Sequence, residues 1–290
     1  MIIANPIYDV VFKRLMEDKR IAKFFIETLT GESIIEIDLK PQEFTYNDRL
    51  AGIAVYRLDF IATIKTTDNE FKKVLIEIQK AKNAVDLMRF RNYLAEQYKK
   101  EDEILTNSGK TKGALPIITI YLLGFKLNEI ETSVIKVNRL YTDLITNTII
   151  NQKSDFIEKL THDCYVVQIP RIQPKLLSKL EVLLTIFEQN YFTDEKEITK
   201  DYSYKVDDDL IKNMVDILHQ AGTDPIERLE IEKEQEALRV YDVGMRELKQ
   251  TISEKDKELS VKDKELSEKD KELLDKDKLI EELLKKIGEK

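Results

Sequence analysis

The pattern of apolar and polar positions predicts a β-hairpin centred near residue 68. Within VLIEIQKAK, residues 74–82, three β-branched residues alternate with Leu75, Glu77 and Gln79, which is typical of a buried or half-buried strand. The stretch AVYRLDFIATIK, residues 54–65, predicts the partner strand. Asp68 and Asn69 between the two tolerate turn conformations, so the strands form a hairpin.

Further elements follow from the same patterns. A period near 3.6 predicts three helices: one from Asn5 or Pro6 to about Leu29, one over 83–102, and one over 174–192 that begins at Pro174. Residues 33–46 are expected to be extended and broken at Pro41. Residues 115–125 and 164–172 are expected to be strands, the first of them central and covered on both faces. This order predicts an α/β fold, a small mixed sheet flanked by helices.

The character of the chain changes after residue 205. Two helical stretches with acidic starts come first, and then apolar residues recur every seven positions: Ile252, Leu259, Leu266, Leu273, Ile280 and Ile287. We therefore expect a domain over 1–205, a helical connector over 206–245 and a charged heptad-repeat helix over 246–290. The second heptad seam is mostly Lys and Asp, so a weak parallel homodimer and a solvated single helix supported by i,i+4 ion pairs both stay open.

Charge is distributed unevenly between these parts. Residues 1–205 carry 30 basic and 30 acidic residues, so the net charge of −8 belongs to the rest of the chain. The acidity of the whole chain therefore does not exclude a nucleic-acid partner for the first domain. Cys164 is the single cysteine, which excludes an internal disulfide and favours a reducing cytoplasm; the sequence predicts neither a signal peptide nor a membrane span.

Two carboxylates fall inside the predicted hairpin. Asp59 lies in the first strand and Glu77 in the second, and neighbouring antiparallel strands bring paired residues within about 5 Å. Two like charges this close repel, and a divalent cation such as Mg²⁺ (or Mn²⁺) relieves the repulsion. Gln79, on the same face as Glu77, can orient a water or a phosphate oxygen. The alternative is that each carboxylate pairs with a cation in a structural network, for example Asp59 with Arg57.

Over roughly residues 5–200 the chain resembles the PD-(D/E)XK nuclease family transposases, which include the recombination-promoting nucleases. The segments that carry the resemblance are DVVFKRLM, RLDFIATI, IEIQ, RFRNY and LPIITIYLLGF. The resemblance implies a restriction-endonuclease-like core, metal binding by Asp59 and Glu77, Gln79 in the third position of the E-x-K element, and a supporting role for Asp9. It implies an endonuclease that hydrolyses phosphodiester bonds in DNA during transposition or recombination.

The chain departs from the family pattern at two positions. Leu58 replaces the proline of the family name, and Gln79 replaces the lysine that is typical of the wider superfamily. Lys80 points to the opposite face by strand parity, so Lys13 or Lys82 is the more plausible substitute. Asp9 near a helix start also has a simpler explanation, a favourable contact with the helix dipole.

A basic segment follows the predicted site. From residue 72 to 100 the chain has eight positive and three negative side chains, and we expect Lys80, Lys82, Arg89, Arg91 and Tyr93 to contact DNA. A solvated helix face is the alternative interpretation. His162 and Cys164 cannot form a four-ligand zinc site, because the chain has only two histidines and one cysteine.

Two functions from different classes therefore compete. The first is a metal-dependent DNA endonuclease that uses Asp59, Glu77, Gln79 and Asp9. The second is a catalytically inactive nuclease fold that serves as a DNA-binding or protein-interaction module, with the heptad helix as its working part. The missing lysine favours the second, and the retained carboxylates favour the first. A purely structural coiled-coil scaffold would leave both carboxylates unexplained.

Overall fold

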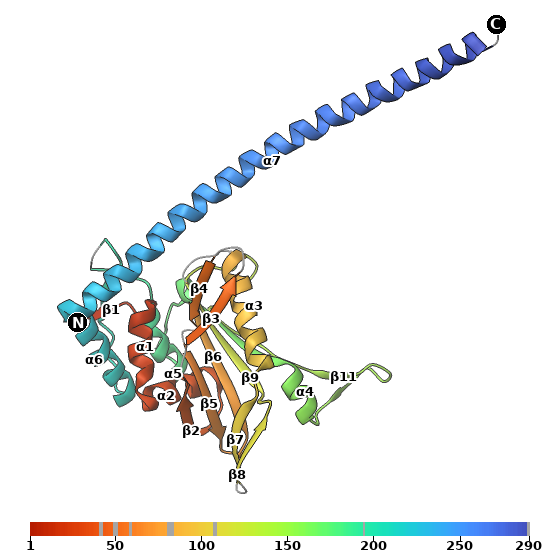
Figure 1. The fold of residues 1–290 in the computed structure, drawn as a ribbon. Helices are drawn as coiled ribbons and strands as arrows, with labels where there is room; N and C mark the ends of the chain where they lie inside the picture. The colour runs from red at the N-terminus through yellow and green to blue at the C-terminus, as the bar shows by residue number, and fades with distance from the viewer. Residues whose placement is uncertain are drawn as a thin grey trace. The chain divides into compact units, whose positions relative to one another are not determined.

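The computed structural model describes residues 1–40, 43–48, 52–57, 60–79, 84–106, 109–193 and 195–288. Its centre is a six-stranded mixed sheet with the order β10-β13-β9-β6-β5-β2. The strands are β2 (Ile34–Leu39), β5 (Phe60–Thr66), β6 (Phe71–Gln79), β9 (Ile117–Leu123), β10 (Val134–Val137) and β13 (His162–Gln168). The predicted α/β class with a small mixed sheet flanked by helices is confirmed (Figure 1).

The predicted hairpin and the predicted central strand are both present. β5 and β6 pair antiparallel from Lys65–Phe71 to Phe60–Ile76, and Asn69 in their turn has a positive φ of 59°. β9 lies between β6 and β13 and pairs parallel with each of them. β6 and β9 are parallel, so the chain must cross over between them, and helix α3 (Ala84–Lys99) is part of that connection.

The remaining strands form four two-stranded sheets. These are β1 (Ile2–Ala4) with β14 (Thr199–Asp201), β3 (Glu43–Asp48) with β4 (Gly52–Arg57), β7 (Asp102–Thr106) with β8 (Gly109–Gly113), and β11 (Tyr141–Asp143) with β12 (Thr148–Ile150). The prediction of one strand over 54–65 is wrong, because β4 and β5 belong to different sheets.

Two predicted helices are shorter than expected. The first is divided into α1 (Asp9–Glu17) and α2 (Lys19–Thr30), because Asp18 is extended and its side chain accepts a hydrogen bond from the N–H of Arg20, which caps α2. The helix expected from Pro174 is reduced to α5 (Lys179–Leu184) and the 3₁₀ turn η2 (Thr185–Phe187). Ser178 and Glu181 form a capping box, so α5 begins only after Ser178.

The other helical elements are α4 (Asp155–Leu160), η1 (Ile169–Arg171), α6 (Asp209–Thr223) and α7 (Pro225–Gly288). Two compact units are distinguished, Met1–Glu234 and Gln235–Lys290. The first unit includes the start of α7 and also α6, which buries Ile211, Met214 and Leu218 in the larger core. In the second unit the heptad residues Ile252 to Ile280 are between 51% and 58% exposed. Within the described residues no helix is both long and apolar enough to cross a membrane.

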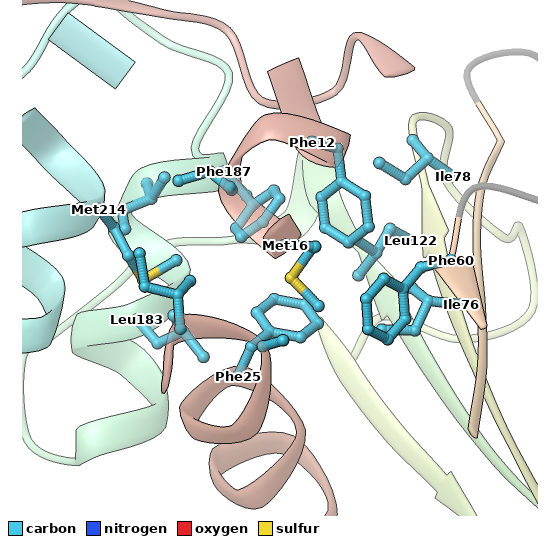
Figure 2. Packing of buried hydrophobic residues seen from close by; sticks show 14 of the residues in the cluster. Phe12, Met16, Phe25, Phe60, Ile76, Ile78, Leu122, Leu183, Phe187 and Met214 are labelled. Carbon is cyan, nitrogen blue, oxygen red and sulfur yellow. The ribbon is translucent and has the colours of Figure 1, made fainter. Parts of the chain in front are cut away.

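The six-stranded sheet separates two hydrophobic clusters. Even-numbered β6 residues, including Ile76 and Ile78, belong to the larger cluster with α1, α2, α5 and α6 (Figure 2). Odd-numbered Leu75 belongs to a smaller cluster that contains Phe90 and Tyr93 of α3. Because side chains alternate along a strand, Lys73, Glu77 and Gln79 share the α3 face with Leu75.

Candidate functional site

Glu77 and Gln79 are both buried at the C-terminal end of β6. Their exposed fractions are 2% and 9%. β9 lies beside them in register, with Tyr121 opposite Glu77 and Leu123 opposite Gln79. The two side chains thus share one face of β6, as predicted, and both are buried on that face. Burying a carboxylate is costly unless an interaction compensates it, so apolar packing alone does not account for a glutamate at position 77.

Helix α3 covers this part of the sheet. The rings of Phe90 and Tyr121 have centroids 4.2 Å apart, and Phe90 is buried. Burial raises the pKa of the Tyr121 hydroxyl, and the neighbouring Cys164 and Glu77 raise it further. The Tyr121 hydroxyl therefore stays protonated near Glu77 at neutral pH and keeps a hydrogen atom to donate.

Several predicted site residues lie outside the described part of the chain. Asp59 is one of them, together with Lys80, Lys82 and the departure at Leu58. The described ladder between β5 and β6 ends with the Phe60–Ile76 pair, directly before Glu77. The described pairing therefore stops one position before Glu77, the residue for which Asp59 is the predicted partner.

Asp9 is the first residue of α1, the helix that precedes the hairpin in the chain. Its Oδ2 atom accepts a hydrogen bond of 2.5 Å from Lys13 Nζ. Its Oδ1 atom is buried, and no described residue forms a hydrogen bond with it. Lys13, one of the two lysines considered as a substitute for the missing one, is therefore already bound to a carboxylate, while half of the Asp9 carboxylate keeps its acceptor capacity.

The predicted basic surface is only partly exposed. Arg91 is exposed on α3, whereas Tyr93 is 5% exposed and packs in the smaller cluster, so its ring lies in the interior. Arg89 lies in α3, and its side chain is outside the described atoms. Within α3, Phe90 and Tyr93 are buried, whereas Leu87 and Tyr98 are exposed.

Two lysines of that basic segment are engaged in ion pairs. Lys72 Nζ lies 2.9 Å from Glu32, and Lys73 Nζ lies 2.7 Å from Asp102 with only 3% of Lys73 exposed. Burial lowers the pKa of Lys73, and the ion pair with Asp102 acts in the opposite direction. These two charges are unavailable to a phosphate backbone. Sequence reasoning missed the burial of Lys73, although its strand parity with Glu77 was a signal.

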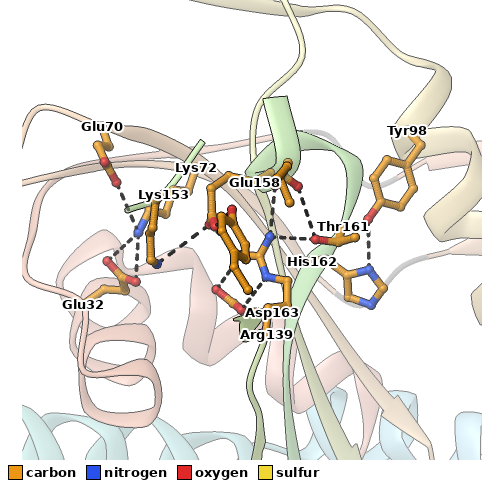
Figure 3. A network of polar contacts seen from close by, with 12 residues as sticks. Glu32, Glu70, Lys72, Tyr98, Arg139, Lys153, Glu158, Thr161, His162 and Asp163 are labelled. Atoms are coloured by element: carbon orange, nitrogen blue, oxygen red, sulfur yellow. Dashed lines mark hydrogen bonds and ion pairs between the residues drawn. The ribbon is translucent and has the colours of Figure 1, made fainter. Parts of the chain in front are cut away.

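The surroundings of His162 and Cys164 favour a structural role for both residues. The Tyr98 hydroxyl lies 2.9 Å from His162 Nδ1 (Figure 3), and burial lowers the pKa of His162. Burial also raises the pKa of the Cys164 thiol, which therefore stays protonated and poorly nucleophilic at neutral pH.

The donor set of the candidate site suits a hard cation. Carboxylate and amide oxygens are the ligands that Mg²⁺ and Mn²⁺ accept, and Glu77 and Gln79 provide one of each. Asp9 Oδ1 is a second buried acceptor, but its helix α1 packs on the opposite face of the sheet from Glu77. Within the described ranges no three acidic, histidine or cysteine side chains form a cluster able to hold a metal. A complete site needs a further ligand from outside them.

No family model, curated protein or solved structure matches this chain.

Proposed function

We propose that this protein is a metal-dependent DNA endonuclease of the PD-(D/E)XK type, acting in transposition or recombination. The observation that carries the proposal is the burial of Glu77 beside Gln79 at the end of β6, next to the last described pair of the hairpin. In the proposal Asp59 and Glu77 form the following pair and hold Mg²⁺ or Mn²⁺ together. Asp9, whose Oδ1 atom is buried at the start of α1, keeps a supporting role in the proposal, from a helix on the other face of the sheet.

The chain's own residues have distinct roles in the proposed reaction. A bound metal would polarise a phosphoryl oxygen and lower the pKa of a water molecule. Gln79 orients the attacking water or a phosphate oxygen through its amide. Arg91, with Arg89 on the same helix, binds phosphates of the DNA backbone. Tyr93 supports α3 from inside rather than contacting DNA, because its ring is buried.

The inactive module remains a second candidate, and one observation favours it. Lys13 is bound to Asp9 and Lys73 to Asp102, so neither is free to replace the lysine that Gln79 displaces. In this alternative the buried site is retained for folding, and the protein acts by binding DNA or another protein.

Cleavage of supercoiled plasmid distinguishes the two candidates. The nuclease should convert plasmid to nicked or linear forms with Mg²⁺ or Mn²⁺ and leave it intact with EDTA. DNA binding with no cleavage under any of these metal conditions would support the inactive module instead. Metal binding by calorimetry, compared between the parent and Glu77→Ala, tests the site independently of cleavage.

A further inference from the structure

A row of apolar side chains follows the exposed part of α7 at a strict spacing of seven residues. Within the unit Gln235–Lys290 this row, which we call the heptad stripe, consists of Ile252, Leu259, Leu266, Leu273 and Ile280, each between 51% and 58% exposed. In a straight α-helix such a repeat drifts by about 20° per heptad, whereas two helices that coil around each other keep it on one face. A helix that stays alone in water needs no such repeat, so the spacing indicates a helical partner.

Two rows of opposite charge flank the heptad stripe. A lysine stands three residues after each of the first four stripe residues, and an aspartate stands four residues after each. At the 3.5 residues per turn of a coiled coil, these steps place the two rows at about −51° and +51° from the stripe. The lysine row is Lys255, Lys262, Lys269 and Lys276, and the aspartate row is Asp256, Asp263, Asp270 and Asp277.

The chain itself leaves most of these charges without a partner. A solvated single helix would be supported by the i,i+4 pair Glu258–Lys262 and its equivalents one and two heptads later. Between described residues of 251–276, however, the one ion pair is Lys255–Glu258, at 2.9 Å. No described residue forms an ion pair with the rest of the lysine row or with the aspartate row. These charges are therefore free to meet a second helix.

The order of the two rows decides the direction in which a second copy fits. When two copies lie parallel around a twofold axis, the lysine row of each faces the aspartate row of the other. When they lie antiparallel, lysine faces lysine and aspartate faces aspartate, and the like charges repel. In the parallel arrangement without a shift, Lys262 and Asp263 of the second copy differ in height by one residue, about 1.5 Å.

We propose that the heptad stripe docks on a second copy of this chain as a parallel, unshifted, two-stranded coiled coil. The stripe residues meet their counterparts across the axis, and lysine–aspartate pairs between the copies cover them on both sides. A shift by one heptad would leave a stripe residue without its counterpart at each end. The aspartate row would repel DNA, whereas it complements the lysine row of the same sequence, so a second copy is the occupant.

This dimer does not depend on the proposed nuclease function, because all of its residues belong to the unit Gln235–Lys290. Charge changes in the full chain test it. The lysine-row variant combines Lys255→Glu, Lys262→Glu, Lys269→Glu and Lys276→Glu, so that acidic residues face each other on both sides of the stripe. The matched control makes the same change in net charge on the far side of the helix, with Lys257→Glu, Lys264→Glu, Lys271→Glu and Lys278→Glu.

A third variant restores the complementarity. It adds the reverse change of the aspartate row to the lysine-row variant: Asp256→Lys, Asp263→Lys, Asp270→Lys and Asp277→Lys. Light scattering coupled to gel filtration, at tens of micromolar, gives the mass of each protein. We expect the parent, the control and the third variant to be dimers and the lysine-row variant to be a monomer. An unfolded tail could not produce this result, because further substitutions would not recover the dimer.

Disulfide formation tests the direction of the two helices. Ile280→Cys is introduced together with Cys164→Ser, so that each chain has one thiol. In the parallel dimer the two thiols face each other and form a disulfide on mild oxidation. In an antiparallel dimer position 280 lies opposite position 252, so the two thiols are about 42 Å apart.

Three results would overturn the proposal. The first is a parent that is monomeric at this concentration. The second is a lysine-row variant that keeps the parent's mass, or a control that dissociates with it. The third is a dimer in which position 280 forms no disulfide.

Discussion

The Glu234 carboxylate accepts a hydrogen bond of 2.9 Å from the backbone N–H of Asp9, 225 positions earlier in the chain. Its second oxygen accepts one of 3.1 Å from the N–H of Val10. Tyr8, at the N-cap position of α1, provides no side-chain cap. The start of α7 therefore caps the helix that carries Asp9, and the negative charge lies at the positive end of the α1 dipole.

Glu234→Ala should lower the free energy of unfolding by about 1–2 kcal/mol, because two charge-assisted hydrogen bonds to a helix start are lost. Glu230→Ala, at an exposed position one turn earlier, is the matched control and should change it by less than about 0.5 kcal/mol. Urea unfolding measures both. Equal effects of the two substitutions would show that the cap contributes nothing.

Gly222→Ala should destabilise the protein although alanine is the better helix former. A Cβ at this position would lie 2.8 Å from the backbone nitrogen of Ala4 in β1. Relieving that contact requires movement of a paired strand, at a cost of about 1–3 kcal/mol. Gly244→Ala, where no described atom lies within 4 Å, is the control and should not lower the thermal midpoint. A Gly222→Ala protein as stable as the parent would contradict the close packing of α6 on β1.

Lys200 should make stability depend on pH. Its Nζ atom is buried and donates to backbone oxygens of Thr185 and Glu188, and burial lowers its pKa to about 7. Between this value and the unfolded pKa of about 10.4, the unfolded chain binds more protons, so this residue makes stability rise with pH.

The Lys200 contribution is measured by comparison with Lys200→Met. Below pH 7 both states of Lys200 are charged, so its contribution to the slope appears above pH 7 and approaches about 1.4 kcal/mol per pH unit. Urea unfolding from pH 6 to 9 should therefore show a smaller rise in the methionine variant. Parallel curves for parent and variant would mean that Lys200 does not lose its proton on folding in this range.

Arg89→Ala with Arg91→Ala should weaken DNA binding and reduce its salt dependence. Each lost phosphate contact removes about one unit from the slope of log K against log salt concentration. Lys212→Ala, an exposed cation of α6, is the control and should leave the slope unchanged. A slope that stays the same in the arginine variant would place DNA elsewhere on the protein.

Much of the sheet and part of the site were accessible from sequence. A period of two placed Glu77 and Gln79 on one face, and the turn at Asp68 and Asn69 gave the hairpin. The division between α1 and α2 was not accessible, because the apolar period continues across Asp18. Neither was the membership of α6 in the first compact unit, since an amphipathic helix shows which face it buries but not against what.

Charge counting was the least reliable guide to the site. Lys72 and Lys73 contribute to the basic segment in the sequence, but partners distant in the chain, Glu32 and Asp102, neutralise them. Tyr93 lies among the same cations and is nevertheless buried. Such pairing depends on how strands and helices meet, and a local net charge does not contain that information.

The most direct test of the proposed function is plasmid cleavage by Glu77→Ala and Asp59→Ala beside the parent, with Mg²⁺ and with EDTA. Glu70→Gln, an exposed carboxylate of the same hairpin, is the matched control. The proposal predicts metal-dependent cleavage by the parent and by Glu70→Gln, and a loss of about 100-fold or more in the two site variants, which remain folded. Cleavage by Glu77→Ala at the parent's rate, or no cleavage by the parent with any divalent metal, would contradict it.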